Sequence, residues 1–172
     1  MKKSEVRELV ITSLFIALVY IFTWLIKIQL PIGAKGGLIH LGNIPFFIAA
    51  ILFGKKVGML SGAIGMGLFD LTSGWVTWAP ITFITCLVMG YAISAINGDK
   101  VEFKKLILSF FAAAILKVLG YYIGEAILFS SLVVPLASIP GNLIQIAVSS
   151  IIILIIIKPL ESAFNYISNS KN

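Results

Sequence analysis

Residues 9–26, LVITSLFIALVYIFTWLI, hold 18 consecutive positions without a charged side chain. A helix of about 20 mainly apolar residues crosses the hydrocarbon core of a bilayer, and this run approaches that length. The segment follows a basic head and ends at Lys27. A secretory signal would have a shorter apolar part followed by a small-residue cleavage site, which is missing here. We therefore expect residues 9–26 to be a retained transmembrane helix.

The whole chain shares this apolar character. Of its 172 residues, 59% are hydrophobic and 12% are charged, whereas an ordinary soluble domain has about a quarter charged residues. These values exclude a soluble globular domain, and they exclude disorder, which requires low hydrophobicity and high charge. The single Cys86 and the single His40 exclude a disulfide framework, a thiolate metal cluster and a multi-histidine metal site. We expect one all-α integral membrane domain over residues 1–172.

Five further apolar runs follow the first, so the chain is expected to have six transmembrane helices. Residues 33–42 between the first two runs are rich in glycine, which permits tight turns, and predict a structured loop. Asn43 is expected to cap the next helix, residues 54–56 to form a turn, and Lys158 and Pro159 to bound the last helix. The expected helices cover residues 9–26, 43–53, 57–72, 79–96, 106–129 and 136–157.

The basic residues predict the orientation of these helices. Cytoplasmic loops of membrane proteins are enriched in Lys and Arg, so the net charge of +6 does not indicate nucleic-acid binding. If both termini are cytoplasmic, ten of the thirteen basic residues fall on that side, and only Lys27 and Lys35 lie outside. Lys117 falls inside the fifth helix. The ten are Lys2, Lys3, Arg7, Lys55, Lys56, Lys100, Lys104, Lys105, Lys158 and Lys171.

Several polar residues then fall at the same depth, in the outer half of the membrane. Asp70 lies near the outer end of the third helix, Glu125 near that of the fifth, and Asn142 and Gln145 in the outer half of the sixth. Because a carboxylate facing lipid is costly, we expect these side chains to line one polar cavity that opens outward, walled by helices three to six. Carboxylates, amides and aromatic faces suit a small, flat, hydroxylated heterocycle.

Lys117, Tyr121 and Glu125 follow one side of the fifth helix at intervals of four residues. Lys117 is about 12 residues from either end of its helix, too deep for easy snorkelling, so it either pairs with a carboxylate or touches a ligand. Trp75 and Trp78 lie at the level of Glu125 and would stack on a flat ring. We expect this group to take part in binding.

Each candidate also has a purely structural interpretation. Trp75 and Trp78 are equally typical of an interfacial aromatic belt. Asp70 would alternatively cap its helix in headgroup water. Asn142, which follows Pro140-Gly141, would alternatively cap a helix start, but Gln145 and Ser149 continue its stripe three and seven residues later, which favours a lined cavity. His40 either closes over a ligand or is a solvated loop residue. The spaced glycines at 58, 62 and 65 and at 120 and 124 indicate close packing between helices.

Sequence signatures of an enzyme are missing. The chain has no phosphate-binding loop of the ATPase type, no His-Glu-x-x-His zinc pair and no nucleophile elbow. It is also short for the paired repeats of secondary transporters. A role in solute movement therefore requires partners, and the small residues Ser13 and Ala17 on the first helix suit docking of another membrane subunit.

Three stretches carry a family resemblance: GGLIHLGNIP at residues 36–45, FGKKVG at 53–58 and GLFDLTSGW at 67–75. With six expected helices, the chain resembles the substrate-binding S components of energy-coupling factor (ECF) vitamin transporters. It looks most like the members for hydroxymethylpyrimidine or pyridoxine-type vitamers, near the riboflavin-type branch.

The resemblance implies a non-enzymatic subunit of the bacterial plasma membrane. Such a subunit binds a vitamin near its outer face, beneath a lid that would include His40, and topples to deliver it inward. Its partners are a transmembrane T component and two ATPases, which use the ATP, and it binds no cofactor or metal itself. Ser13 and Ala17 match the family's alanine-x-x-x-alanine contact for the T component, with serine in the first place.

Alternatives remain open at this point. Riboflavin or another vitamin is an alternative substrate, and a structural or assembly subunit of a membrane complex is an alternative function. A small membrane enzyme would use Asp70 and Glu125 as an acid/base pair. The residues expected to contact substrate are Glu125, Asn142, Gln145, Asp70, Lys117, Tyr121, Trp75, Trp78 and His40.

Overall fold

The computed structural model describes residues 2–29, 38–98 and 100–169 of the chain. Helices dominate these residues, and one short antiparallel hairpin interrupts them. In chain order the elements are α1 (Lys3–Leu25), β1 (Lys27–Gln29), β2 (Leu38–His40), α2 (Asn43–Leu52), α3 (Gly54–Thr72), η1 (Val76–Trp78), α4 (Ala79–Asn97), α5 (Phe103–Phe129), η2 (Val134–Ser138) and α6 (Ile139–Asn169).

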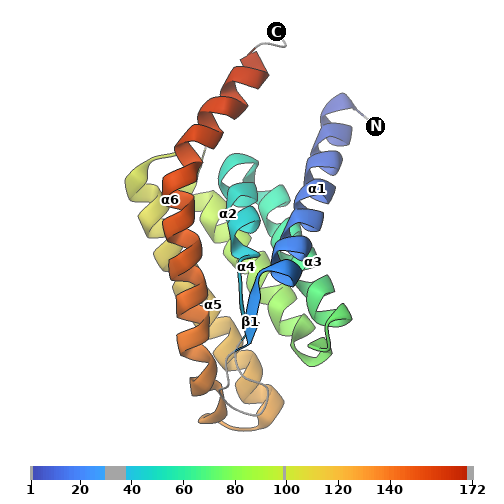
Figure 1. The fold of residues 1–172 in the computed structure, drawn as a ribbon, viewed down its shortest axis with the longest axis vertical. Helices are drawn as coiled ribbons and strands as arrows, with labels where there is room; N and C mark the ends of the chain where they lie inside the picture. The colour runs from blue at the N-terminus through green and yellow to red at the C-terminus, as the bar shows by residue number, and fades with distance from the viewer. Residues whose placement is uncertain (1, 30–37, 99, 170–172) are drawn as a thin grey trace.

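The helices form one bundle with both chain termini at the same end (Figure 1). We call this the terminal end, and we call the opposite end, formed by residues 73–78 and 130–138, the distal end. Helix α3 packs against α1, α2 and α4, while α5 packs against α4 and α6. The short α2 lies between α1 and α6 and contacts both (Figure 1). The bundle thus surrounds α2 with longer helices.

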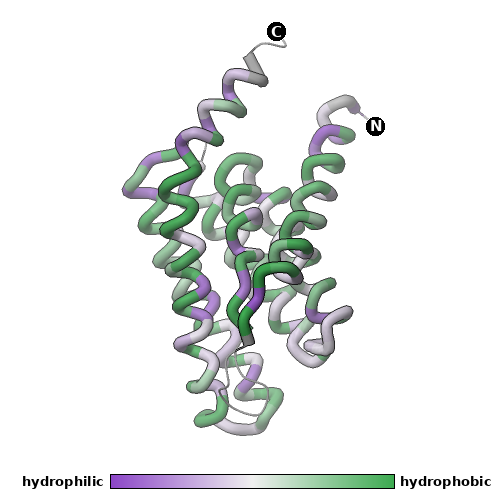
Figure 2. The backbone as a smooth tube through the Cα atoms, viewed as in Figure 1, coloured by the Kyte–Doolittle hydropathy of each residue, from purple (hydrophilic) through white to green (hydrophobic). Residues whose placement is uncertain are grey.

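Hydrophobic residues cover most of the length of the helices, and hydrophilic stretches lie near the terminal end, in the central hairpin and at places lower in the bundle (Figure 2). Within the described residues, four helical segments are long and apolar enough to cross a membrane: Ser4–Leu25, Val76–Asn97, Phe103–Phe129 and Val134–Tyr166. The protein is therefore an all-α multi-pass membrane protein, as predicted. Helix α2 has ten residues and spans about 15 Å, and α3 is less apolar, so six spans and the orientation of the termini stay predictions.

Glycines allow the helices of the core to approach closely. A Cβ atom added at Gly58 of α3 would lie 2.6 Å from the Cα atom of Ala50 in α2. One added at Gly90 of α4 would lie 2.8 Å from the backbone of Met59. Gly120 and Gly124 of α5 approach α4 in the same way, through Thr85 and Ile81. The spaced glycines therefore serve packing within the chain, as the sequence indicates.

The region between α1 and α2 differs from the prediction. A structured loop is expected over residues 33–42, but Leu38–His40 forms a strand that pairs with Lys27–Gln29. Residues 33–37 of that predicted loop lie outside the described residues. The prediction that Asn43 caps α2 is wrong, because Gly42 holds the cap position and no side chain caps the helix. The Asn43 side chain points to α6 instead, as described below.

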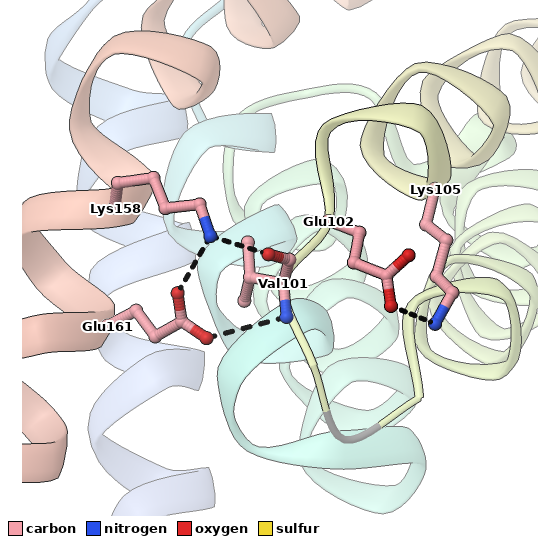
Figure 3. Close-up of polar contacts among 5 residues, drawn as sticks. All are labelled: Val101, Glu102, Lys105, Lys158 and Glu161. Atoms are coloured by element: carbon pink, nitrogen blue, oxygen red, sulfur yellow. Dashed lines mark hydrogen bonds and ion pairs between the residues drawn. The ribbon is translucent and has the colours of Figure 1, made fainter.

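The last helix also differs, because it does not stop before Pro159 but continues to Asn169. Because Pro159 removes a helical hydrogen bond, contacts before and after it must stabilise the part of α6 that continues beyond it. Lys158 Nζ donates to the Val101 carbonyl at 2.6 Å, and the Val101 N–H donates to Glu161 at 3.4 Å (Figure 3). Further along, the ring of Phe164 packs on that of Phe53 at 5.0 Å. Likewise, residues 54–56 are not a separate turn, because α3 begins at Gly54.

Candidate functional site

Glu125 lies one turn before the distal end of α5, and its side chain is buried (5% exposed). Trp78 Nε1–H donates to its Oε1 at 2.9 Å, and the hydroxyl of Ser138 donates to its Oε2 at 2.6 Å. Both carboxylate oxygens are therefore held by neutral donors from η1 and η2. The Trp78 ring also contacts those of Trp75 and Phe129, at centroid distances of 5.3 and 5.9 Å. Its bond to Glu125 gives Trp78 a partner that a simple belt residue would not need.

A second buried carboxylate, Asp70, lies near the distal end of α3 and is 8% exposed. The hydroxyl of Thr82 in α4 donates to Asp70 Oδ2. Since that proton points to Asp70, the Tyr121 hydroxyl of α5 donates to Thr82 Oγ1, at 2.8 Å. This chain of polar groups joins three helices. Its burial argues against a solvated helix cap as the role of Asp70.

Lys117 lies one turn deeper on α5 and is 2% exposed. Its Nζ donates to Gln145 Oε1 of α6 at 2.8 Å and lies 5.7 Å from the centre of the Tyr121 ring. Three ion pairs are found among the described residues, and none includes Lys117. Within these residues the prediction of a carboxylate partner for Lys117 is therefore wrong. Its partner is a neutral amide, and contact with a ligand stays a prediction.

Gln145 connects α5, α6, α2 and the hairpin. Its Nε2–H donates to the Leu38 carbonyl of β2, while its Oε1 also accepts from Asn43 Nδ2 at 3.5 Å. Asn43 was not predicted to belong to this group, because its position at the start of an apolar run is typical of a cap. Ser138 was missed as well, although a hydroxyl just before α6 falls at the level of Glu125.

The remaining predicted residues have few or no contacts with this group of buried polar side chains. Asn142 is buried (8% exposed) one turn before Gln145, and the structure gives it no side-chain hydrogen bond among the described residues. Trp75 is half-buried and reaches the group only through Trp78. Ser13 and Ala17 are exposed on α1, apart from this group.

His40 is buried in β2 (8% exposed), so the interpretation as a solvated loop histidine is wrong. Burial and the nearby Lys117 lower the pKa of His40 well below its ordinary value. The ring is therefore neutral, which agrees with its Nδ1 accepting the Gly42 N–H at 3.3 Å. The ring lies 6.4 Å from that of Phe69 on α3. His40 thus helps to fix the hairpin against α3.

The polar groups do not line the groove that the structure describes between α3 and α4. This groove has a volume of about 430 Å³, and its walls include Gly67, Leu71, Val76 and Phe83. Its lining is apolar, so it is not the predicted polar cavity. Within the described residues, no group of three His, Cys, Asp or Glu side chains is placed to hold a metal ion. The described polar group thus consists of hydrogen-bond donors and acceptors with aromatic rings beside them.

Comparison with known proteins identifies the family of the chain. Residues 3–162 match the model of a family described as "ECF-type riboflavin transporter, S component". A protein from Pyrococcus woesei described as "Uncharacterized protein in gap 3'region" is 30% identical over 94 residues. That match covers 55% of this chain and 63% of the relative, so the chain spans less than two thirds of the relative's length. The chain belongs to the ECF-type riboflavin transporter S component family.

Proposed function

We propose that the buried polar residues near the distal end capture a flat, hydroxylated heterocyclic vitamin from outside the cell. The observation that carries this proposal is the burial of Asp70, Lys117 and Glu125, each hydrogen-bonded to neutral groups and none paired with another. Charged side chains within a membrane protein are costly and typical of substrate pathways. A ligand that engages them would compensate this cost.

The aromatic residues beside these charges support a ring-shaped ligand. Trp78 and Tyr121 each contact a charged or polar member of the group, and Trp75 packs on Trp78. The substrate would be a hydroxymethylpyrimidine-like or pyridoxine-like vitamer, to which residues 36–45, 53–58 and 67–75 point. Riboflavin is the second candidate, because the matching family is described by that vitamin.

The same proposal extends to the assembly. In it, α1 to α6 cross a bacterial plasma membrane with both termini in the cytoplasm, and the distal end faces outward. A T component docks on α1 at Ser13 and Ala17, two ATPases supply the energy, and toppling delivers the vitamin inward. The exposure of both small residues supports such a contact. This chain would bind the vitamin alone, without a cofactor.

The experiment that tests the proposal is a binding measurement on the purified chain in lipid nanodiscs. Riboflavin, hydroxymethylpyrimidine and pyridoxine are titrated separately by calorimetry, and quenching of tryptophan fluorescence is followed in parallel. We expect saturable binding of at least one, with quenching that Trp24→Phe keeps and Trp78→Phe reduces. A structural or assembly subunit would show neither heat nor quenching with any of the three.

A further inference from the structure

Two buried polar groups beside Gln145 have unused hydrogen-bonding capacity. Asn43 is fully buried, and its Oδ1 atom has no hydrogen-bond partner among the described residues. Lys117 has three N–H donors, and within the same part of the chain one is used, in the bond to Gln145. Buried polar groups in native proteins are nearly always paired, so unpaired ones require an explanation. A ligand that supplies the missing partners is such an explanation.

Gln145 does not supply those partners: its oxygen already accepts from both Lys117 and Asn43, and neither of its N–H donors reaches Asn43 Oδ1. Its Oε1 has two lone pairs, which accept from Lys117 Nζ at 2.8 Å and from Asn43 Nδ2 at 3.5 Å. One of the two Nε2–H donors goes to the Leu38 carbonyl. Gln145 therefore acts as a positioning residue that keeps the ammonium of Lys117 and the amide of Asn43 beside each other, on one shared oxygen.

The unused hydrogen-bonding groups of Lys117 and Asn43 are complementary, because one is a donor and the other an acceptor. Lys117 offers N–H donors that carry positive charge, and Asn43 Oδ1 offers an acceptor. A molecule that satisfies both must present an acceptor next to a donor on one rigid edge. A carbonyl beside a ring N–H has this arrangement, as in a cyclic imide, and so does a ring nitrogen beside an amino group.

We propose that Lys117 and Asn43 together bind the donor–acceptor edge of a nitrogen heterocycle, its acceptor on Lys117 and its N–H on Asn43 Oδ1. This rests on the proposed function and narrows its substrate class. Riboflavin carries such an edge in its imide, and hydroxymethylpyrimidine carries one in its aminopyrimidine ring. Pyridoxine has hydroxyl groups but no ring N–H or amino group, and it is expected to bind more weakly.

The test compares each vitamin with an analogue that lacks the N–H. Riboflavin is paired with 3-methylriboflavin, and hydroxymethylpyrimidine with its 4-dimethylamino analogue, by calorimetry on the full chain in nanodiscs. For the vitamin that binds, we expect the wild type to prefer the unmethylated form by about tenfold or more. Asn43→Ala should abolish this preference by weakening binding of the unmethylated form alone.

Asn97 provides a matched control, because it is also a buried asparagine (1% exposed) whose Oδ1 has no partner among the described residues, but it lies at the terminal end of α4. Asn97→Ala should leave the preference unchanged. Gln145→Leu should reduce the preference, whereas Gln145→Glu, which keeps acceptors for Lys117, should retain it. The wild-type comparison needs no variant, so it decides the question even if Asn43→Ala fails to fold.

Three results would overturn the inference. One is equal binding of methylated and unmethylated forms by the wild type. Another is an equal loss of both forms in Asn43→Ala, which would assign Asn43 a structural role. In both cases the proposed function would stand. If no vitamin binds the wild type at all, the proposed function fails together with the inference.

Discussion

Charged side chains lie in exposed ion pairs at one end of the molecule and are buried without an ionic partner toward the other, among the described residues. At the terminal end, Lys105 pairs with Glu102 at 2.8 Å and Lys158 with Glu161 at 3.4 Å, in pairs that water reaches. Lys105, by its hydrogen bond and its charge, lowers the pKa of the Glu102 carboxyl. Toward the distal end, Asp70, Lys117 and Glu125 are buried, and each is held by neutral groups.

This difference separates exposed ion pairs from buried charged groups that are hydrogen-bonded to neutral partners. Exposed ion pairs contribute about 0–1 kcal/mol each to stability. Replacing buried charged groups by apolar groups of similar size is often neutral or even stabilising. The distal charges are therefore poorly explained by stability, and the ligand capture proposed above would account for them. The following changes test this contrast, starting with the largest expected effect.

Replacing Lys117 with Met removes the buried cation and keeps most of its volume. We expect ligand affinity to fall by about 1.5–3 kcal/mol, because a charged hydrogen bond to the ligand is lost. Thermal stability should stay the same or rise, because no buried charge remains to be desolvated. Calorimetry and thermal unfolding in the same nanodiscs measure both effects.

Lys56→Met is the matched control at the terminal end, where Lys56 pairs with Glu8 and is 70% exposed. It should leave affinity unchanged. Equal affinities of the Lys117→Met variant and the wild type would remove Lys117 from the site.

Glu125→Gln and Asn142→Ala should each weaken ligand binding by about 1–3 kcal/mol if each loses a buried hydrogen bond. In the first variant the new amide has one acceptor oxygen in place of two, so Trp78 and Ser138 can no longer donate to separate oxygens. Titration by calorimetry checks both variants. Glu161→Gln at the terminal end serves as control, and unchanged affinity in both distal variants would refute this part of the site.

Ala17→Phe tests whether the exposed face of α1 is the docking surface for the T component. We expect vitamin binding to persist and recovery of the T component in a pull-down to fall severalfold, because the bulky ring keeps the partner helix away. Ile155→Phe, at a position of α6 that is 70% exposed, is the control for a bulky ring in the membrane. Normal recovery of the T component with Ala17→Phe would remove this face as the docking surface.

Lys158→Ala should have the smallest effect. It breaks the bond from Lys158 to the Val101 carbonyl and the exposed pair with Glu161 (Figure 3). We expect a loss of up to about 1 kcal/mol in unfolding free energy and no change in affinity. A drop in affinity as large as that of Lys117→Met would show that the two ends are not independent.

Much of this fold could be predicted from the sequence, because apolar runs such as residues 9–26 and 79–96 determine helices locally. Their positions within those runs also predicted that Asp70, Glu125 and Gln145 lie toward the same end of the bundle. The hairpin could not be predicted, since strands of three residues carry no usable alternation. The continuation of α6 past Pro159 depends on Val101 and Phe53, which are distant in sequence.

The partners within the site were the hardest part to predict. Asn43 and Gln145 are 102 residues apart, and no local pattern links them. Lys117 was expected to pair with a carboxylate or to contact a ligand. In the structure its ammonium donates to the side-chain amide of Gln145 on α6. Side-chain depth can be read from a membrane sequence, but the choice of partner depends on how the helices rotate and pack.

The most direct test of the central claim is native mass spectrometry of the gently purified chain after incubation with the three vitamins. We predict one bound vitamin on the wild type and on Lys56→Met, and little or none on Lys117→Met. Equal occupancy of all three proteins, or no bound vitamin on any of them, would contradict the claim that the buried distal charges form the capture site.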